Sequence, residues 1–267
     1  MRPCVCVEML FADLPFEERM RRAAAAGFGA VEFWSWKDKD IPSVAAAARE
    51  TGVAIANFSG HRAGDLVDPA RHDEVLADFL SALEAARALG CPTLMLLAQE
   101  LGEGGRVVRG RASEAGPSEV SAIAAGARLL LGRLPEGEGP SIGLEPLNTV
   151  RDHPGYCVSR VATAARAVAE AGDPRFGLVL DLYHQAMMGD DTAALVREYA
   201  PMIKHVHVAD APGRHEPGTG RVDWIETLGA LGDAGYEGYV GFELSPAGSD
   251  EAALEAISRL WRELEGR

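Results

Sequence analysis

Strand-like and helix-like segments alternate along the whole of this 267-residue chain, and this alternation limits the folds open to it more than any other feature. Short apolar runs predict strands, and helical spacing of apolar residues follows each of them. The predicted strands are Cys4–Val7, Ala30–Phe33, Val53–Phe58, Thr93–Leu97, Ser141–Glu145, Gly177–Asp181, Ile203–Val208 and Val240–Glu243. The predicted helices are Phe16–Ala26, Ile41–Glu50, Pro69–Leu89, Ser118–Leu134, Val158–Ala171, Asp191–Tyr199, Asp223–Ala234 and Glu251–Leu264.

Eight strand–helix pairs in a chain of this length predict an α/β fold of the (β/α)8 TIM barrel type. No linker or change of composition divides the chain, so we expect residues 1–267 to form a single domain. The competing doubly wound sheet carries a GxGxxG turn after its first strand, and this sequence has none there. The glycine- and arginine-rich segment Gly102–Gly116 is predicted to be a long loop over the top of the barrel, with Ser118 as N-cap of the next helix.

The charge and composition disfavour several kinds of partner. The chain has 26 Lys and Arg against 40 Asp and Glu, and its net charge of −14 argues against a nucleic-acid surface. The N-terminus lacks the apolar core of a signal peptide, and no apolar run is long enough to span a bilayer. We therefore expect a cytoplasmic enzyme that acts on a small molecule, either as a monomer or as a homo-oligomer. The four cysteines follow no CxxC spacing and are expected to be buried and reduced.

The segment Ile203–Gly220 carries the first sign of an active site. As a strand, its beginning places His205 and His207 on one face. The turn-rich loop that follows contains Arg214. Imidazoles at the end of a strand, beside a loop with a cation, favour a functional site, and an ordinary histidine-containing strand with a surface loop is the alternative for this segment alone.

Ionisable residues end each of the last four predicted strands: Glu145, Asp181, His207 and Glu243. They are 36, 26 and 36 residues apart, each close to one strand–helix unit. The C-terminal ends of barrel strands all face one mouth, so these side chains can converge there. Three carboxylates and an imidazole predict a site for a divalent metal. The oxygen ligands favour Mn²⁺ or Mg²⁺, and the imidazole is also compatible with Zn²⁺ or Co²⁺.

Alternation of side chains along the same strands predicts a second layer beneath this site. If the four ionisable residues point inward, then so do Gly143, Val179, His205 and Gly241 one layer below, and we expect the two glycines to leave room for His205. The residues between the two layers should then pack outward against the helices; these are Leu144, Leu180, Val206 and Phe242.

Two residues near the expected mouth are candidates for binding substrate. His184 follows Asp181 by three residues and is either a hydrogen-bonding partner of the substrate or an ordinary loop histidine. Arg214 is suited to hold a substrate oxygen or carboxylate.

A third group of residues follows the second predicted strand. Glu32 ends that strand, and a structural hydrogen bond is its favoured role. The aromatic side chains of Phe33, Trp34 and Trp36 form either a wall of the pocket or part of the core.

Motifs over nearly the whole length resemble the hydroxypyruvate isomerase-like branch of the sugar isomerase/epimerase barrels, which have the fold of xylose isomerase. They are PFEERMRRAAAAGFGAVEFW near the N-terminus, then GLEPLN followed by PGY, LDLYHQ, HVHVAD, EPGTG and GFELSP. The resemblance implies a divalent metal held by Glu145, Asp181, His207 and Glu243. It also implies that Glu145 and Glu243 act as an acid/base pair and that His184 and Arg214 contact the substrate.

One residue departs from this family pattern. Hydroxypyruvate isomerases of the branch carry Gln where this chain has His207, whereas the related ketose 3-epimerases carry His. The chemistry that fits is proton transfer between adjacent carbons next to a carbonyl, with the metal stabilising the charge of an enediolate. We expect conversion of hydroxypyruvate to tartronate semialdehyde, with a ketose 3-epimerase or related sugar isomerase as the alternative.

Two further classes of function remain open. A metal-dependent phosphodiesterase on the same barrel would need more metal ligands and a basic face for DNA, and the acidic composition disfavours it. A non-catalytic barrel is disfavoured because both Glu145 and Glu243 are present.

Overall fold

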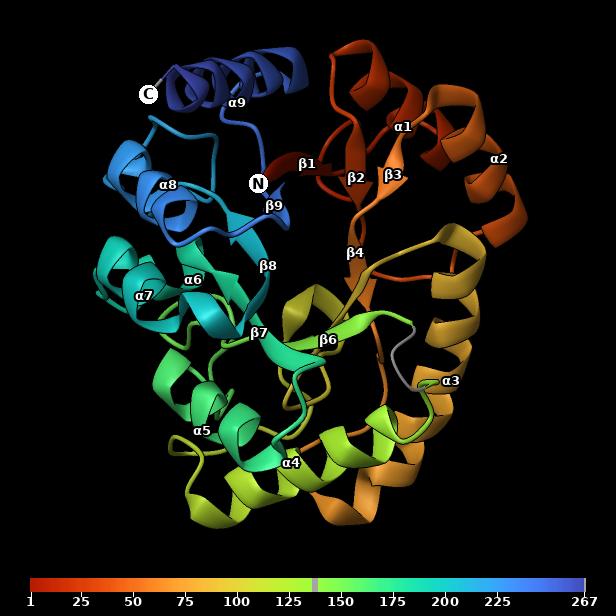
Figure 1. Cartoon of the computed structure of the whole chain (residues 1–267), viewed down its shortest axis with the longest axis vertical. Coiled ribbons are helices and arrows are strands. Elements are labelled where there is room, and N and C mark those ends of the chain that lie inside the picture. Colours follow the sequence, from red (N-terminus) through yellow and green to blue (C-terminus); the bar gives the residue numbers. More distant parts are fainter. Residues whose placement is uncertain (136–138, 267) are drawn as a thin grey trace.

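A computed structural model describes residues 1–135 and 139–266. Its strands form one parallel sheet that curls into a barrel, with the helices on the outside (Figure 1). The strands are β1 Arg2–Cys6, β2 Ala30–Glu32, β3 Ala54–Ile55, β4 Asn57–Ser59, β5 Thr93–Leu96, β6 Ser141–Leu144, β7 Phe176–Asp181, β8 Ile203–Val208 and β9 Tyr239–Phe242. Hydrogen-bonded neighbours follow in the order β3-β2-β1-β9-β8-β7-β6-β5-β4. The predicted barrel fold is confirmed.

The third predicted strand, Val53–Phe58, is divided in two at Ala56. β3 pairs with β2, and β4 pairs with β5. Backbone hydrogen bonds close the remaining seam of the barrel, because Ala56 N donates to Val31 O at 2.8 Å and Ser59 N donates to Trp34 O at 3.1 Å. β3 and β4 thus share one strand position, and the 9 described strands fill the eight positions of a TIM barrel.

The helices are α1 Phe16–Ala25, α2 Ile41–Thr51, α3 His72–Leu89, α4 Pro117–Leu131, α5 Val161–Ala171, α6 Leu182–Met187, α7 Thr192–Tyr199, α8 Trp224–Asp233 and α9 Asp250–Glu265. Short 3-10 turns occupy Pro69–Arg71, Glu103–Gly105 and Ala200–Met202. Gly52, Gly90 and Gly172 end α2, α3 and α5 in the left-handed conformation that lets the chain turn back toward the next strand. No helix in the described ranges is long and apolar enough to cross a membrane.

Two predictions about helices were wrong or incomplete. Ser118 is not the N-cap of α4: the helix begins at Pro117, a favoured first residue, and Gly116 precedes it. The Glu119 carboxylate accepts a hydrogen bond from Gly116 N at 3.1 Å, which satisfies that end of the helix. The short helix α6 directly after β7 was not predicted. It forms because the Asp181 carboxylate caps it by accepting from His184 N at 3.0 Å.

The apolar core lies between the barrel and the surrounding helices. The four residues predicted to point outward are fully buried there: Leu144, Leu180, Val206 and Phe242. They join a continuous apolar cluster with residues of the helices, such as Leu228 of α8 and Ile257 of α9. The alternation of β6–β9 therefore holds as predicted, and the opposite faces of these strands are free to carry polar side chains into the barrel.

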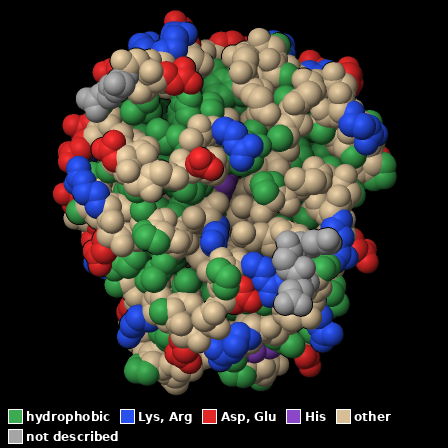
Figure 2. Space-filling model, viewed as in Figure 1, with side chains coloured by type: hydrophobic (Ala, Val, Ile, Leu, Met, Phe, Trp, Pro, Cys, Tyr) green, Lys and Arg blue, Asp and Glu red, His purple; other side chains and the backbone are tan. Residues whose placement is uncertain are grey.

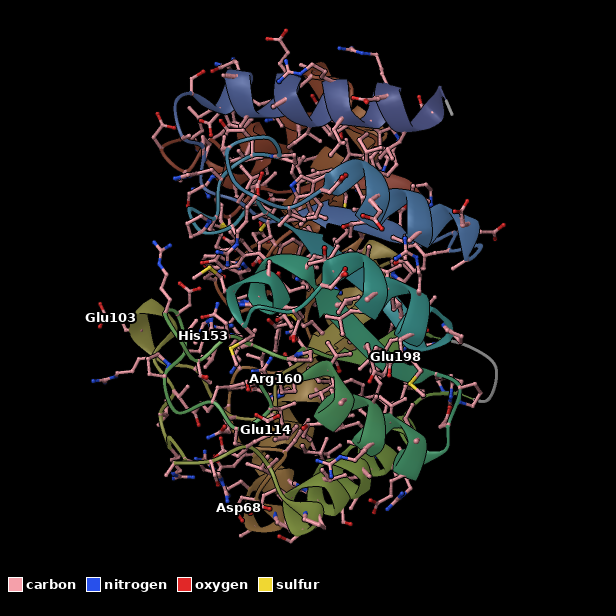
Figure 3. The ribbon with its side chains drawn as sticks, turned by 90° about the vertical axis from the view of Figure 1, so that its left-hand side faces the viewer. Asp68, Glu103, Glu114, His153, Arg160 and Glu198 are labelled. Atoms are coloured by element: carbon pink, nitrogen blue, oxygen red, sulfur yellow. The ribbon has the colours of Figure 1, made fainter. Side chains whose placement is uncertain are left out.

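The long loop Gly102–Gly116 packs against the segment that follows β6. Arg111 N donates to Gly155 O at 2.8 Å, and Ala115 N donates to Cys157 O at 2.6 Å. The two backbones approach so closely that a Cβ on Gly155 would lie 3.0 Å from the Gly110 Cα. Glu103 and His153 accordingly lie near one another at one edge of the molecule (Figure 3), where a His153 ring nitrogen is 2.7 Å from Gly105 O.

Candidate active site

The four polar strand ends of β6–β9 meet in one place. Asp181 and His207 belong to β7 and β8, while Glu145 and Glu243 directly follow β6 and β9. All four side chains are buried, and each offers a ligand atom within 4.8 Å of the others. The structure thus brings together the four residues that the sequence predicted to converge.

His207 lies at the centre of this group. Its Nδ1 is 2.8 Å from Glu145 Oε1 and 3.7 Å from Glu243 Oε2. Its other ring nitrogen, Nε2, faces away from these carboxylates, toward Glu32 Oε1 at 3.7 Å. The imidazole therefore lies between Glu145 and Glu243 on one side and Glu32 of β2 on the other.

The surroundings of the two candidate proton carriers drive their pKa values apart. Burial raises the pKa of Glu145 to about 7, and the neighbouring carboxylates add to this effect. Burial acts on Glu243 in the same direction, but the cations Arg214 and His207 outweigh it and lower its pKa. Burial likewise opposes charge on His207, yet Glu32 and the other two glutamates around it raise its pKa well above the ordinary value. Opposite shifts on paired groups are a feature of acid/base sites.

Arg214 reaches back from the loop after β8 into this group. Its Nη2 donates to Glu243 Oε2 at 2.6 Å and lies 3.7 Å from Asp181 Oδ2. The other oxygen of Glu243 accepts a hydrogen bond from the indole nitrogen of Trp34, which follows β2. Glu243 is therefore oriented by a cation on one oxygen and by an indole on the other.

His184 is on α6, and its ring is buried beside the site. Nε2 lies 3.4 Å from Asp181 Oδ2, and Nδ1 lies 2.7 Å from the side-chain nitrogen of Asn148. The Asn148 amide in turn donates to Asp152 Oδ2 at 2.6 Å. This chain of contacts fixes the ring orientation, and His184 lies in α6 and lines the cavity instead of standing in a loop. Its contact with a substrate stays a prediction.

The donor set fits a divalent cation. Opposite ligands of an octahedral Mg²⁺ are about 4.2 Å apart, so small inward movements would bring the four side chains into range. The carboxylates Glu145, Asp181 and Glu243 supply hard oxygen ligands, and His207 supplies one nitrogen. Two of these carboxylates, Asp181 and Glu243, share the same cationic partner, Arg214, at 3.7 and 2.6 Å.

A cavity of about 580 Å³ opens directly above these residues. Glu145, Glu243, His184 and Arg214 line it, as do residues that the sequence did not single out. The latter include Arg62, Asp152 and His153, and Gly102–Gly105 of the predicted long loop also line the cavity. The alternatives for the aromatic residues are also resolved: Trp34 lines the cavity and is 40% exposed, whereas Phe33 and Trp36 are buried in the core.

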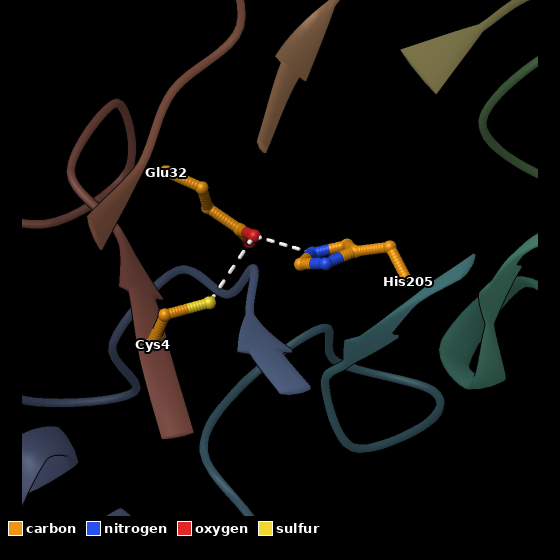
Figure 4. Close-up of side chains that lie close together, drawn as sticks. All are labelled: Cys4, Glu32 and His205. Atoms are coloured by element: carbon orange, nitrogen blue, oxygen red, sulfur yellow. Dashed lines mark hydrogen bonds and ion pairs between the residues drawn. The ribbon is translucent and has the colours of Figure 1, made fainter. Parts of the chain in front are cut away.

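A second polar cluster lies beneath the first, formed by Cys4, Glu32 and His205 (Figure 4). Glu32 Oε2 is 2.6 Å from His205 Nε2 and accepts from Cys4 Sγ at 3.4 Å. The prediction that Gly143 and Gly241 make room for His205 was wrong. A Cβ on Gly241 would lie 2.2 Å from both oxygens of Glu32, so this glycine makes room for Glu32, and a Cβ on Gly143 would instead meet Val179.

Residues 20–264 match the family described as xylose isomerase-like TIM barrel. The chain belongs to this family. The match spans all four strands that carry the candidate metal ligands, so the site described above lies at the carboxyl-end mouth of a xylose isomerase-like barrel.

Similar proteins cover this xylose isomerase-like barrel almost completely. A putative hydroxypyruvate isomerase of Streptomyces coelicolor is 33% identical over 96% of this chain and 94% of its own length. A 2-oxo-tetronate isomerase of Pectobacterium atrosepticum is 26% identical over 93% of each chain. Among solved structures, one described as an AP endonuclease, family 2, from Brucella melitensis is 29% identical and superposes with a TM-score of 0.84, covering 97% of this chain and 98% of that one.

The sequence analysis named Glu32 for a structural hydrogen bond and Trp34 for the pocket wall or the core of this xylose isomerase-like barrel, and the structure shows Glu32 bonded to His205 and Trp34 lining the cavity. It did not show which residues of distant strands the two side chains contact. Trp34 and Glu243 are 209 positions apart, and Glu32 and His205 are 173 apart. Glu32 was noticed because it ends a strand as the four metal-site residues do, but that position alone does not identify His205 as its partner. No comparable pattern indicated Arg62 or Asn148.

Proposed function

We propose that this protein is a metal-dependent isomerase of a small hydroxy-oxo acid, with hydroxypyruvate, converted to tartronate semialdehyde, as the first substrate to test. The observation that carries the proposal is the placement of Glu145 and Glu243 in one buried site, joined through His207. The names of the relatives support an isomerase of small hydroxy-keto acids.

The reaction would be a proton transfer between adjacent carbons. One of the two glutamates removes a proton from C3 of hydroxypyruvate, and the other delivers a proton to C2. The hydroxyl proton moves from the oxygen on C3 to the oxygen on C2, so that an aldehyde forms where the alcohol was and no atom is gained or lost. When bound, a divalent ion held by Glu145, Asp181, His207 and Glu243 would act as a Lewis acid toward the substrate oxygens.

The remaining residues of the cavity would position the substrate and exclude water. His184 is held by Asp181 and Asn148, so it can present a fixed hydrogen-bonding edge. Trp34 and Arg214 hold both oxygens of Glu243, which keeps this carboxylate aimed at the reacting carbon. The long loop lines the cavity through Gly102–Gly105.

The cavity contains two arginines that could bind the carboxylate of an acidic substrate. Arg214 pairs with Glu243 and Asp181, so part of its charge is already engaged. Arg62 lines the same cavity, and its guanidinium forms no ion pair with an acidic side chain in the described part of the chain. Arg62 follows β4 and Arg214 follows β8, four positions apart on the eight-position ring, so the two cations flank the cavity from opposite sides.

A ketose 3-epimerase or related sugar isomerase is the second candidate, and the size of the cavity favours it. Pockets of about 300–1,000 Å³ hold drug-sized ligands, and the cavity of about 580 Å³ leaves room for more than three carbons. A four-carbon hydroxy-oxo acid would use this room and still offer a carboxylate to Arg62 or Arg214.

The experiment compares kcat/KM for hydroxypyruvate, 2-oxo-tetronate, fructose and tagatose with Mn²⁺ present. We expect an acid to be the best substrate and solvent deuterium to enter the product at the carbon that receives the proton. Arg214→Gln and Arg62→Gln should each raise KM for the acid by roughly 10-fold or more, since each removes a charge-assisted hydrogen bond, and have a smaller effect on a neutral sugar. A higher kcat/KM for a neutral ketohexose would show that the substrate is a sugar and that the assignment of an acid is wrong.

Two other functions find less support. A phosphodiesterase that attacks DNA needs a basic surface, and the chain has a net charge of −14. On the face shown in Figure 2, basic side chains are scattered among acidic ones. A non-catalytic barrel would turn over none of the four substrates with Mn²⁺ present, so turnover of any of them, measured beside the metal content of the purified protein, distinguishes it from an enzyme.

A further inference from the structure

The two carboxylate oxygens of Glu32 have different surroundings. Oε2 lies against His205 Nε2 and Cys4 Sγ, as Figure 4 shows. Oε1 is buried and has no hydrogen-bond partner among the described residues. A buried carboxylate oxygen without a donor is costly, so its position calls for a partner in the functional state. His207 Nε2, at 3.7 Å, is suitably placed.

The two nitrogens of His207 also face different groups. Nδ1 is on the side of Glu145 and Glu243, where the metal ligands gather, and Nε2 is on the side of Glu32. An imidazole that gives its Nδ1 lone pair to a metal must keep its proton on Nε2. That proton then points toward the unpartnered oxygen of Glu32.

We propose that Glu32 is a positioning residue that holds His207 in the tautomer and orientation required for metal binding. A shift of less than 1 Å would convert the 3.7 Å separation into a hydrogen bond of about 2.9 Å. Metal-binding histidines usually donate their second ring N–H to a carboxylate or carbonyl, and loss of that partner costs 10- to 100-fold in metal affinity or activity.

The neighbours of Glu32 in the second polar cluster hold it in place. His205 lies under His207 on the same strand and binds the other oxygen of the carboxylate. Gly241 provides the space, because any side chain there would collide with the Glu32 carboxylate. This role rests on the metal site of the proposed function, and it is independent of which substrate the enzyme uses.

The test measures Mn²⁺ affinity by calorimetry without substrate, so it does not depend on turnover. Glu32→Gln keeps the size of the side chain and removes the accepting charge, and we expect Mn²⁺ to bind 10- to 100-fold more weakly. Glu32→Asp keeps the charge but withdraws it by one methylene, and should fall between Glu32→Gln and the wild type. Glu119→Gln, at the start of α4, is the matched control and should bind Mn²⁺ as the wild type does. Saturating Mn²⁺ should restore kcat of Glu32→Gln to within about threefold of wild type.

Nitrogen-15 NMR of histidine in the wild type gives a second measurement that needs no variant at Glu32. With Mg²⁺ bound, the His207 signals, assigned from their loss in His207→Asn, should show a protonated Nε2 and an unprotonated Nδ1. A proton on Nδ1 in the Mg²⁺ complex would overturn the proposal. So would Mn²⁺ affinity in a folded Glu32→Gln protein equal to that of the wild type. A wild type that binds no divalent metal at all would overturn the metal site of the proposed function together with this role.

Discussion

His205 and His207 lie two residues apart on β8 with ring centroids 4.9 Å from each other, yet their surroundings shift the pKa values of the two rings in opposite directions. His207 faces the three glutamates Glu32, Glu145 and Glu243, and its pKa is raised. His205 faces Glu32 as its main acidic partner, and burial lowers its pKa despite that contact. Similar burial is therefore accompanied by opposite pKa shifts, because the number of nearby carboxylates decides which effect is larger.

The two layers also differ in what lies beside them. The upper layer consists of Glu145, Asp181, His207 and Glu243, and its two glutamates line the cavity of about 580 Å³. The lower layer, Cys4, Glu32 and His205, is buried and does not line that cavity. We infer that the upper layer binds the metal and transfers the proton, and that the lower layer holds one metal ligand, His207, in place.

Removal of the proton carriers of the upper layer should have the largest effect. Glu145→Gln and Glu243→Gln keep the shape of the side chain but cannot accept a proton, so kcat should fall at least ~10²-fold. The measurement is kcat at saturating Mn²⁺ for the best substrate found, with Glu119→Gln as a control outside the barrel. Retained activity in either variant would remove that glutamate from the acid/base pair.

Metal addition and removal should distinguish the two histidines. A ligand at 100 times its dissociation constant stabilises the native state by about 2.7 kcal/mol, which corresponds to roughly 5–10 °C for a chain of this size. We expect Mn²⁺ to raise Tm by this amount in the wild type, and EDTA to reverse it. His207→Ala should lose the shift, whereas His205→Ala should start from a lower Tm and keep most of it. Equal shifts in both variants would contradict the assignment of His207 as a metal ligand.

The pH dependence of the metal-free protein should report the upper layer. The pKa of Glu145 is about 7 in the folded state against 4.5 ordinarily, so its stabilising contribution is complete below pH 4.5 and is lost as the pH rises through about 7. The raised pKa of His207 acts in the same direction at higher pH. The measurement is urea unfolding in EDTA at pH 5, 6, 7 and 8. Between pH 5 and pH 8 the free energy of unfolding of the wild type should fall by on the order of 2 kcal/mol more than that of Glu145→Gln. A fall of equal size in both proteins would assign the effect to other groups.

The barrel and the upper layer were predictable from the sequence because both follow from short-range periodicity. The spacing of strands and helices locates the strand ends, and parallel geometry then brings Glu145, Asp181, His207 and Glu243 to one mouth. The split of the third strand at Ala56 could not be predicted in the same way, because it depends on how the seam of the barrel closes.

The lower layer was only partly predictable, because its contacts depend on how far side chains reach across the barrel. Alternation placed His205 below His207, but it could not show that Glu32 extends from β2 to contact both histidines. The space for this contact is created by Gly241, whose role was predicted for the wrong partner. The capping of α6 by Asp181 likewise arises from a side chain that ends one element and begins another.

A substitution of Cys4 should have the smallest effect, and it tests whether the two oxygens of Glu32 have separate roles. The Cys4 thiol is a weak donor to Glu32 Oε2, the oxygen that also contacts His205. The other oxygen, Oε1, is the one that faces His207. Cys4→Ser should therefore change the free energy of unfolding by no more than about 1.5 kcal/mol, the upper range for one hydrogen bond. Mn²⁺ affinity should stay within about threefold of wild type, as measured by calorimetry beside a urea titration. If Cys4→Ser instead weakened Mn²⁺ binding as much as Glu32→Gln, the lower layer would act on His207 as one unit, and the two oxygens of Glu32 would not have separate roles.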